Sequence, residues 1–151
     1  MKIFKNKQSN IELLNICEKL DIPVKIVMKD ELIGNISDGN YIVNLQNSNE
    51  RGSHWTVLIK RKGKYFYSDS FGAPPPQTLI DNLKINSDNL FFNDHQIQDV
   101  DSTLCGYFAI YFLLCFKGKN AKANINKYLN TFDLNNQINN NKIINNIFSQ
   151  L

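Results

Sequence analysis

The longest apolar stretch of the chain runs from Leu104 to Phe116 and contains no charged residue. Its thirteen residues are too few to cross a bilayer, which takes about 20. We therefore expect a buried helix around which the other elements pack, with Cys105 in its first turn. Unpaired backbone N–H groups and the helix dipole stabilise a thiolate over a thiol at that position, so Cys105 is the first candidate for chemistry.

Amphipathic spacing predicts helices on both sides of this stretch. Ser9 and Glu12 form a capping-box pair ahead of regularly spaced apolar residues, which predicts a helix over about residues 10–20, stopped by Pro23. A second helical pattern covers residues 77–84. In the asparagine-rich tail, apolar residues again recur at helical intervals and predict two terminal helices.

Strand-like runs predict a sheet. Tyr41–Leu45 reads as one short strand, and His54–Ile59 and Lys64–Asp69 read as an antiparallel hairpin joined at Lys62-Gly63. Residues 90–98 look like one more strand that ends near the buried helix. The expected fold class is α+β, with a central mixed or antiparallel β-sheet packed on a buried helix that carries Cys105, and with flanking N- and C-terminal helices.

Composition fits one compact domain over residues 1–151, with 42% apolar and 21% charged residues. The three cysteines are odd in number and contain no CxxC pair. This disfavours a disulfide scaffold or a zinc site and favours a reducing intracellular compartment. The first ten residues lack the apolar region of a secretion signal. We expect no metal and no cofactor.

The net charge of +3 is modest, but four basic residues cluster at the turn of the hairpin: Lys60, Arg61, Lys62 and Lys64. The simpler interpretation is a solvated hairpin tip. Contact with an acidic partner such as nucleic acid is the alternative.

The hairpin brings two polar residues together. His54 opens one strand and Asp69 closes its antiparallel neighbour, so the carboxylate can hold the imidazole. In cysteine catalysis a histidine exchanges a proton with the thiol and protonates the leaving amine, while an acid orients the ring. Gln98, seven residues before Cys105, offers an amide N–H to a developing oxyanion beside the backbone N–H of Cys105.

Each of these residues also has a structural interpretation. A histidine before a tryptophan is often structural, Asp69 can form a turn, Gln98 can cap a strand, and a cysteine in an apolar helix can simply pack.

The other cysteines and the other histidine are interpreted as structural. Cys17 lies on the apolar face of the first helix. Cys115 lies at the far end of the buried helix, where the dipole disfavours a thiolate. His95 lies in a polar stretch, a predicted loop, with no suitable neighbour at hairpin distance.

The candidate residues carry a family resemblance. The chain resembles the adenovirus maturation protease, adenain, and its relatives in virophages and Polinton-type elements, and the SUMO-specific proteases of the same clan share the His-Trp, Asp and Gln-to-Cys-Gly order. The resemblance covers about residues 42–116 and rests on these blocks: Ile42-Val43-Asn44, Gly52-Ser53-His54-Trp55, Asp69-Ser70-Phe71-Gly72, and Gln98 separated by six residues from Cys105-Gly106.

This resemblance implies an adenain-like cysteine protease fold and a role for each residue. His54 would be the general base and acid, Asp69 its orienting carboxylate, and Cys105 the nucleophile. Gln98 would be the oxyanion donor. The implied substrate-binding residues are Trp55, which would wall the site, and Gly106, which would let the backbone pack closely beneath it.

The chain departs from adenain in four respects. Adenain carries a glutamate where this chain has Asp69, and the interval from the histidine to the acid is two residues shorter here. Neither change removes the chemistry. The chain is also shorter and has no counterpart of the cysteine that joins adenain to its activating peptide. Activation by a peptide or by DNA is therefore not carried over, although the basic hairpin turn keeps DNA open as a partner.

By this resemblance we expect a viral maturation cysteine endopeptidase that cleaves capsid or other structural precursor proteins, with a glycine near the scissile bond. It would act as a monomer, without a membrane, in the host cell cytoplasm or viral factory and in the packaged virion. Three alternatives remain: an isopeptidase acting on ubiquitin-like proteins, an acyltransferase of the same clan, and a nucleic-acid-binding module that uses the basic cluster.

Overall fold

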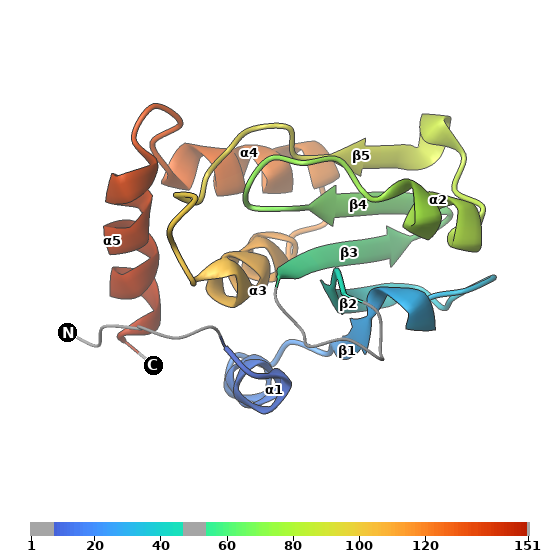
Figure 1. Cartoon of the computed structure of the whole chain (residues 1–151), viewed down its shortest axis with the longest axis horizontal. Coiled ribbons are helices and arrows are strands. Elements are labelled where there is room, and N and C mark those ends of the chain that lie inside the picture. Colours follow the sequence, from blue (N-terminus) through green and yellow to red (C-terminus); the bar gives the residue numbers. More distant parts are fainter. Residues whose placement is uncertain (1–7, 47–53, 151) are drawn as a thin grey trace.

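The computed structural model describes residues 8–46 and 54–150. Within these ranges the fold is α+β, with five strands and five α-helices (Figure 1). The strands are β1 (Lys25–Met28), β2 (Gly39–Asn44), β3 (Trp55–Arg61), β4 (Lys64–Ser68) and β5 (Leu90–Phe92). The helices are α1 (Asn10–Lys19), α2 (Gln77–Leu83), α3 (Cys105–Cys115), α4 (Ala121–Thr131) and α5 (Gln137–Phe148), with short 3-10 turns at Lys29–Glu31 and Ser87–Asn89.

The sheet is mixed, in the order β1-β2-β3-β4-β5. Strands β2, β3 and β4 are antiparallel neighbours, whereas β1 runs parallel to β2 and β5 runs parallel to β4. The predicted hairpin is confirmed as β3 and β4. Its turn residues, Lys62 and Gly63, have φ angles of 50° and 78°. Positive φ at both central positions matches the twist of the flanking strands, and glycine adopts it at no steric cost.

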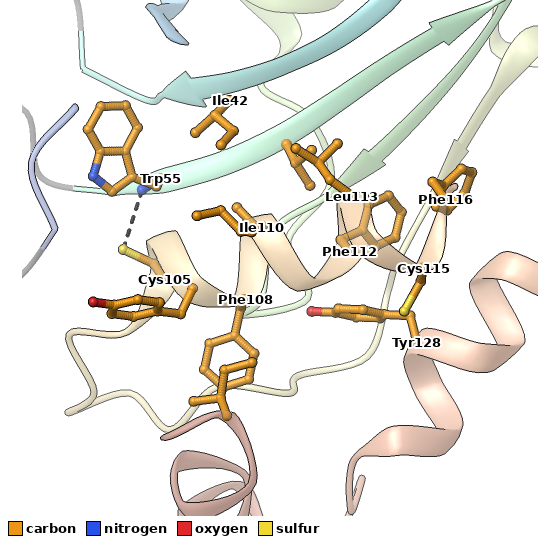
Figure 2. Close-up of a cluster of buried hydrophobic side chains, with 14 of the residues drawn as sticks. Ile42, Trp55, Cys105, Phe108, Ile110, Phe112, Leu113, Cys115, Phe116 and Tyr128 are labelled. Carbon is orange, nitrogen blue, oxygen red and sulfur yellow. Dashed lines mark hydrogen bonds between the residues drawn. The ribbon is translucent and has the colours of Figure 1, made fainter. Parts of the chain in front are cut away.

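Helix α3 is the predicted buried helix, and it packs on one face of the sheet. Nearly all of its residues are buried, and it contacts Ile42, Val57, Ile59 and Phe66 in one core cluster. Figure 2 shows Cys105 in the first turn of α3 and Cys115 at the opposite end, beside Tyr128 of α4. The opposite face of the sheet is covered by α2, through Leu79 and Leu83.

The predicted helices on either side of α3 are confirmed, with small differences at their ends. Ser9 and Glu12 form the capping box that begins α1. Asparagine side chains begin the two terminal helices, because Asn120 caps α4 and Asn136 caps α5. In the described residues no helix is long and apolar enough to span a membrane.

The strand predicted over residues 90–98 is only partly correct. Strand β5 ends at Phe92, and the chain then runs as a loop to α3. The backbone N–H groups of Ile97 and Gln98 both donate to the carbonyl oxygen of Ser70, at 2.8 and 2.9 Å. Buried Asn140 of α5 holds the same loop by donating to the carbonyl of Ile97 at 2.9 Å. The Asn140 side chain and the Ser70 carbonyl thus provide the hydrogen bonds that a neighbouring strand would otherwise provide. Strand β1 was not predicted.

Candidate active site

His54 and Asp69 are in direct contact. The Nε2 atom of His54 lies 2.8 Å from Oδ1 of Asp69, and the two side chains are only 16% and 4% exposed. His54 immediately precedes β3 and Asp69 immediately follows β4, so the hairpin brings the two together as expected. Continuing the register that pairs Val57 with Ser68 would place Phe71 opposite His54. Asp69 therefore reaches His54 through the turn that follows β4.

That turn explains how the carboxylate is held. The Gly72 N–H donates to the carbonyl of Asp69 at 2.8 Å, and the Phe71 N–H donates to Oδ1 of the Asp69 side chain at 2.8 Å. Gly72 has a φ of +83°, and a Cβ there would lie 2.8 Å from the Gln96 backbone nitrogen. Asp69 is therefore both a turn residue and the partner of His54, so the two interpretations of its role are compatible.

The imidazole of His54 is also packed. Its ring stacks on that of Phe71, with centroids 4.8 Å apart and an interplanar angle of 21°. An aromatic neighbour on one face and a carboxylate at Nε2 restrict the ring to one orientation. Its second nitrogen, Nδ1, is left free of Asp69, and Cys105 is close enough to contribute to the raised pKa of His54.

Cys105 is the first residue of α3 and is 1% exposed. Its sulfur accepts a hydrogen bond of 3.5 Å from the backbone N–H of Trp55, the contact drawn in Figure 2. All three cysteines are free and buried. Its polar neighbours, rather than its exposure, distinguish Cys105 from the other two.

The protonation of His54 follows from these neighbours. Burial by itself lowers the pKa of His54, but the hydrogen bonds with Asp69 and Cys105, and the charges of both, outweigh burial and raise it from 6.5 to about 9. At neutral pH His54 is therefore an imidazolium, which donates from Nε2 to the carboxylate and from Nδ1 towards the sulfur. It carries the proton that an acid catalyst needs.

Gln98 lies in the loop before α3 and is 0% exposed. Its Nε2 donates to the carbonyl oxygen of Ser102 at 2.9 Å, and its Oε1 accepts a hydrogen bond from the hydroxyl of Ser70. One of the two amide hydrogens is used by Ser102, which leaves the other for an oxyanion. The Ser102 carbonyl and the Ser70 hydroxyl, rather than strand pairing, hold the Gln98 side chain in place.

Trp55 and Gly106 are linked through Gln8, a buried residue that the sequence did not single out. The indole N–H of Trp55 donates to the carbonyl of Gln8 at 2.8 Å, and the Gly106 N–H donates to Oε1 of Gln8 at 3.1 Å. A Cβ on Gly106 would lie 2.7 Å from Cδ2 of Leu13. Glycine fits here because Leu13 of α1 and Gln8, which precedes α1, pack against the start of α3.

The Gln8 contact matters for the helix terminus. The residue before α3, Leu104, offers no side-chain cap. Gln8 instead satisfies the N–H of the second helical residue, Gly106. The N–H of the first residue, Cys105, has no acceptor within the helix, because the first four N–H groups of any α-helix lack one. That N–H lies on the same residue as the sulfur, as an oxyanion site requires.

The structural interpretations of Cys17, Cys115 and His95 fit the structure. Burial raises the pKa of Cys17 to about 11, and burial also raises the pKa of Cys115. Both thiols are therefore held protonated. His95 lies on the surface, with Nε2 3.5 Å from Oδ1 of the exposed Asp94.

The interpretation of the basic cluster as a solvated tip is wrong for two of its four members. Lys60 is 9% exposed, and its ammonium donates to Oδ1 of Asn35 and to the carbonyl of Ile36 at 2.8 and 2.7 Å. Arg61 donates to the carbonyls of Phe116 and Gly118, at the end of α3. These two cations satisfy the protein's own acceptors. They do not form a single exposed patch with Lys62 and Lys64.

Four residues around the site were missed from sequence: Gln8, Ser70, Phe71 and Ser102. Ser70 and Phe71 follow Asp69 directly, so the turn after β4 was the available signal. Gln8 contacts a residue 98 positions away, and no local pattern indicates it. In the part of the chain that the structure describes, no group of three or more His, Cys, Asp or Glu side chains is arranged to hold a metal.

No protein-family model matches the sequence, and no curated protein matches it. Among solved structures, the chain matches the crystal structure of the Se-Met ASFV pS273R protease, at 15% sequence identity and a TM-score of 0.35. The match covers 70% of this chain and 43% of that one, so this chain spans less than half the length of the protease it matches.

Proposed function

We propose that the protein is a cysteine endopeptidase, with Cys105 as nucleophile, His54 as general acid and base, and Asp69 as the residue that orients His54. The observation that carries the proposal is the position of His54, which contacts a buried carboxylate at Nε2 and adjoins Trp55, whose backbone N–H lies 3.5 Å from the sulfur of Cys105, the first residue of a buried helix. A histidine held between an acid and a thiol supports nucleophilic catalysis by the thiol.

In the acylation step the Cys105 sulfur, as thiolate, attacks the carbonyl carbon of a peptide bond. A C–S bond forms, and the carbonyl oxygen becomes an oxyanion that accepts hydrogen bonds from Nε2 of Gln98 and from the backbone N–H of Cys105. The C–N bond then breaks as the imidazolium of His54 transfers its proton to the leaving amine. The products are a thioester on Cys105 and a neutral His54.

In the deacylation step neutral His54 takes a proton from water, and the hydroxide attacks the thioester carbon. The C–S bond breaks, the carboxylic acid product leaves, and Cys105 and His54 return to their starting forms. Asp69 stays ionised throughout and keeps Nε2 of His54 protonated. Each step uses only protein groups and water, so no cofactor is required.

The substrate class is also a proposal. The resemblance carried by the His54-Trp55, Asp69–Gly72, Gln98 and Cys105-Gly106 blocks supports cleavage of a viral capsid or structural precursor, with a glycine near the scissile bond. Trp55 is buried and its backbone N–H contacts the Cys105 sulfur, so we expect it to narrow the site in favour of a small residue. Such a protease would act in the host cell cytoplasm or viral factory and in the packaged virion.

The first test is selective alkylation. We expect iodoacetamide, a small reagent, to modify Cys105 at neutral pH well before Cys17 or Cys115, as read by mass spectrometry of peptides. The His54→Gln variant should lose this selectivity, because the imidazolium no longer supports a thiolate. Equal rates at all three cysteines would overturn the proposal.

The second test is cleavage. The protein is co-expressed with the structural proteins encoded beside it, and the products are identified by mass spectrometry. Cys105→Ala should abolish processing, and Cys115→Ala, the matched control on the same helix, should retain it. Processing by Cys105→Ala would rule out the proposed nucleophile.

A further inference from the structure

Ser70 lies next to Asp69 and is buried, at 4% exposure. Its hydroxyl donates to Oε1 of Gln98, and its carbonyl accepts the backbone N–H of Gln98 at 2.9 Å. The same residue therefore holds Gln98 at both its backbone and its side chain. The third point of attachment is the carbonyl of Ser102, which accepts from Nε2 at 2.9 Å.

The orientation of the Gln98 amide follows from these partners. A carbonyl oxygen only accepts hydrogen bonds, so the Ser102 carbonyl must face Nε2. The opposite end of the amide, Oε1, then faces Ser70, whose hydroxyl donates to it. An amide fixed in this way presents its remaining N–H in one direction only.

We propose that Ser70 is a positioning residue of the proposed protease: it holds the Gln98 amide in the orientation in which Nε2 serves the oxyanion. This inference rests on the proposed function. Two adjacent residues in the turn after β4 would then have separate roles. Asp69 orients His54, which carries the proton, and Ser70 orients Gln98, which donates to the oxyanion.

Loss of the Ser70 hydroxyl should change the orientation of the Gln98 amide, because Gln98 is 0% exposed. Without it, Oε1 is a buried acceptor that water cannot reach, and such a group moves to regain a partner. Any rotation of the amide moves Nε2 away from the oxyanion. The effect should therefore appear in the step that forms an oxyanion and be absent from reactions of Cys105 that form none.

Two reagents distinguish reactions of Cys105 that form an oxyanion from those that form none. Iodoacetamide alkylates the sulfur without an oxyanion, whereas an N-acylglycine p-nitrophenyl ester acylates Cys105 through one. We expect Ser70→Ala to acylate about 10- to 100-fold more slowly than wild type, somewhat less than the loss from deleting an oxyanion donor. Its iodoacetamide rate at Cys105, and the pH profile of that rate, should stay within about two-fold of wild type.

The double variant tests the route of the effect. In a Gln98→Ala background, Ser70→Ala should slow acylation no further, because its influence passes through Gln98. Ser68→Ala is the matched control, since Ser68 is also buried, on β4, and makes none of the contacts to Gln98. It should acylate like wild type.

These experiments test the role of Ser70 separately from the proposed protease function. Wild-type acylation by Ser70→Ala, a further loss in the double variant, or slower alkylation would each overturn the role of Ser70. If wild type is never acylated, the proposed function fails, and the positioning contact is then judged by NMR. Ser70→Ala should speed hydrogen exchange of the Gln98 side-chain amide, and unchanged exchange would overturn the contact.

Discussion

His54 and Asp69 form a 2.8 Å contact although the hairpin register places Phe71, not Asp69, opposite His54. The stacked Phe71 ring occupies the opposite position, and the turn after β4 directs the carboxylate back to Nε2. The acid therefore depends on the turn as much as on the strands. Changes at either element should be visible in the protonation of His54.

The first prediction concerns Asp69→Asn. Asp69, through its hydrogen bond and its charge, acts together with Cys105 to raise the pKa of His54 from 6.5 to about 9; the variant loses the Asp69 charge, so the imidazolium should deprotonate at lower pH. We expect kcat/KM to fall on the order of 10²-fold or more, with its alkaline limb displaced to lower pH. NMR titration of the His54 ring measures the pKa directly, and a ring that still titrates near pH 9 would contradict the assignment.

The same pKa makes stability depend on pH. The folded-state pKa of His54 is raised, so its contribution is fully present below pH 6.5 and is lost as pH rises towards about 9. The free energy of unfolding of wild type should therefore decline between these values relative to His54→Gln. Urea titrations at several pH values measure the difference. Parallel curves for the two proteins would show that folding does not raise the pKa of His54.

Gly106→Ala should destabilise the fold. Its Cβ would lie 2.7 Å from Cδ2 of Leu13 and 2.8 Å from Oε1 of Gln8, so these two buried side chains must move. Such overpacking costs about 1–3 kcal/mol, which chemical denaturation measures.

Gly63→Asn is the matched control for Gly106→Ala. A Cβ at Gly63 meets nothing within 4 Å, and asparagine tolerates its positive φ. The control should stay within about 1 kcal/mol of wild type. Equal stability of Gly106→Ala and wild type would mean that the contact of α1 with α3 yields easily.

Arg61→Ala should also destabilise the protein, through the end of α3 opposite Cys105. The Arg61 guanidinium donates to the carbonyls of Phe116 and Gly118 and lies 5.4 Å from the centroid of the Phe116 ring. A cation at a helix C-terminus satisfies carbonyls that lack partners, and its loss should cost about 1–2 kcal/mol. Thermal unfolding tests this against Lys64→Ala, an exposed residue of the same hairpin, which should be neutral. A larger effect from Lys64 would contradict it.

Local signals account for the elements that were predicted correctly. The capping box of α1, the Lys62-Gly63 turn and the apolar run of α3 all depend on neighbours within a few residues. Strand β1 was missed because its four residues are partly exposed and pair in parallel with β2, a partner 16 positions away. Residues 96–98 were misassigned because the Ser70 carbonyl, rather than a strand, accepts the N–H groups of Ile97 and Gln98.

The amino-acid order specifies which chemical groups are present, and local patterns place His54, Asp69 and Cys105 at the ends of recognisable elements. How these groups act depends on the folded structure. The pKa of His54, the orientation of Gln98 and the contact of Gln8 with Gly106 depend on atoms brought together from distant parts of the chain. Protonation and hydrogen-bond direction follow distance and burial, and those are properties of the folded protein.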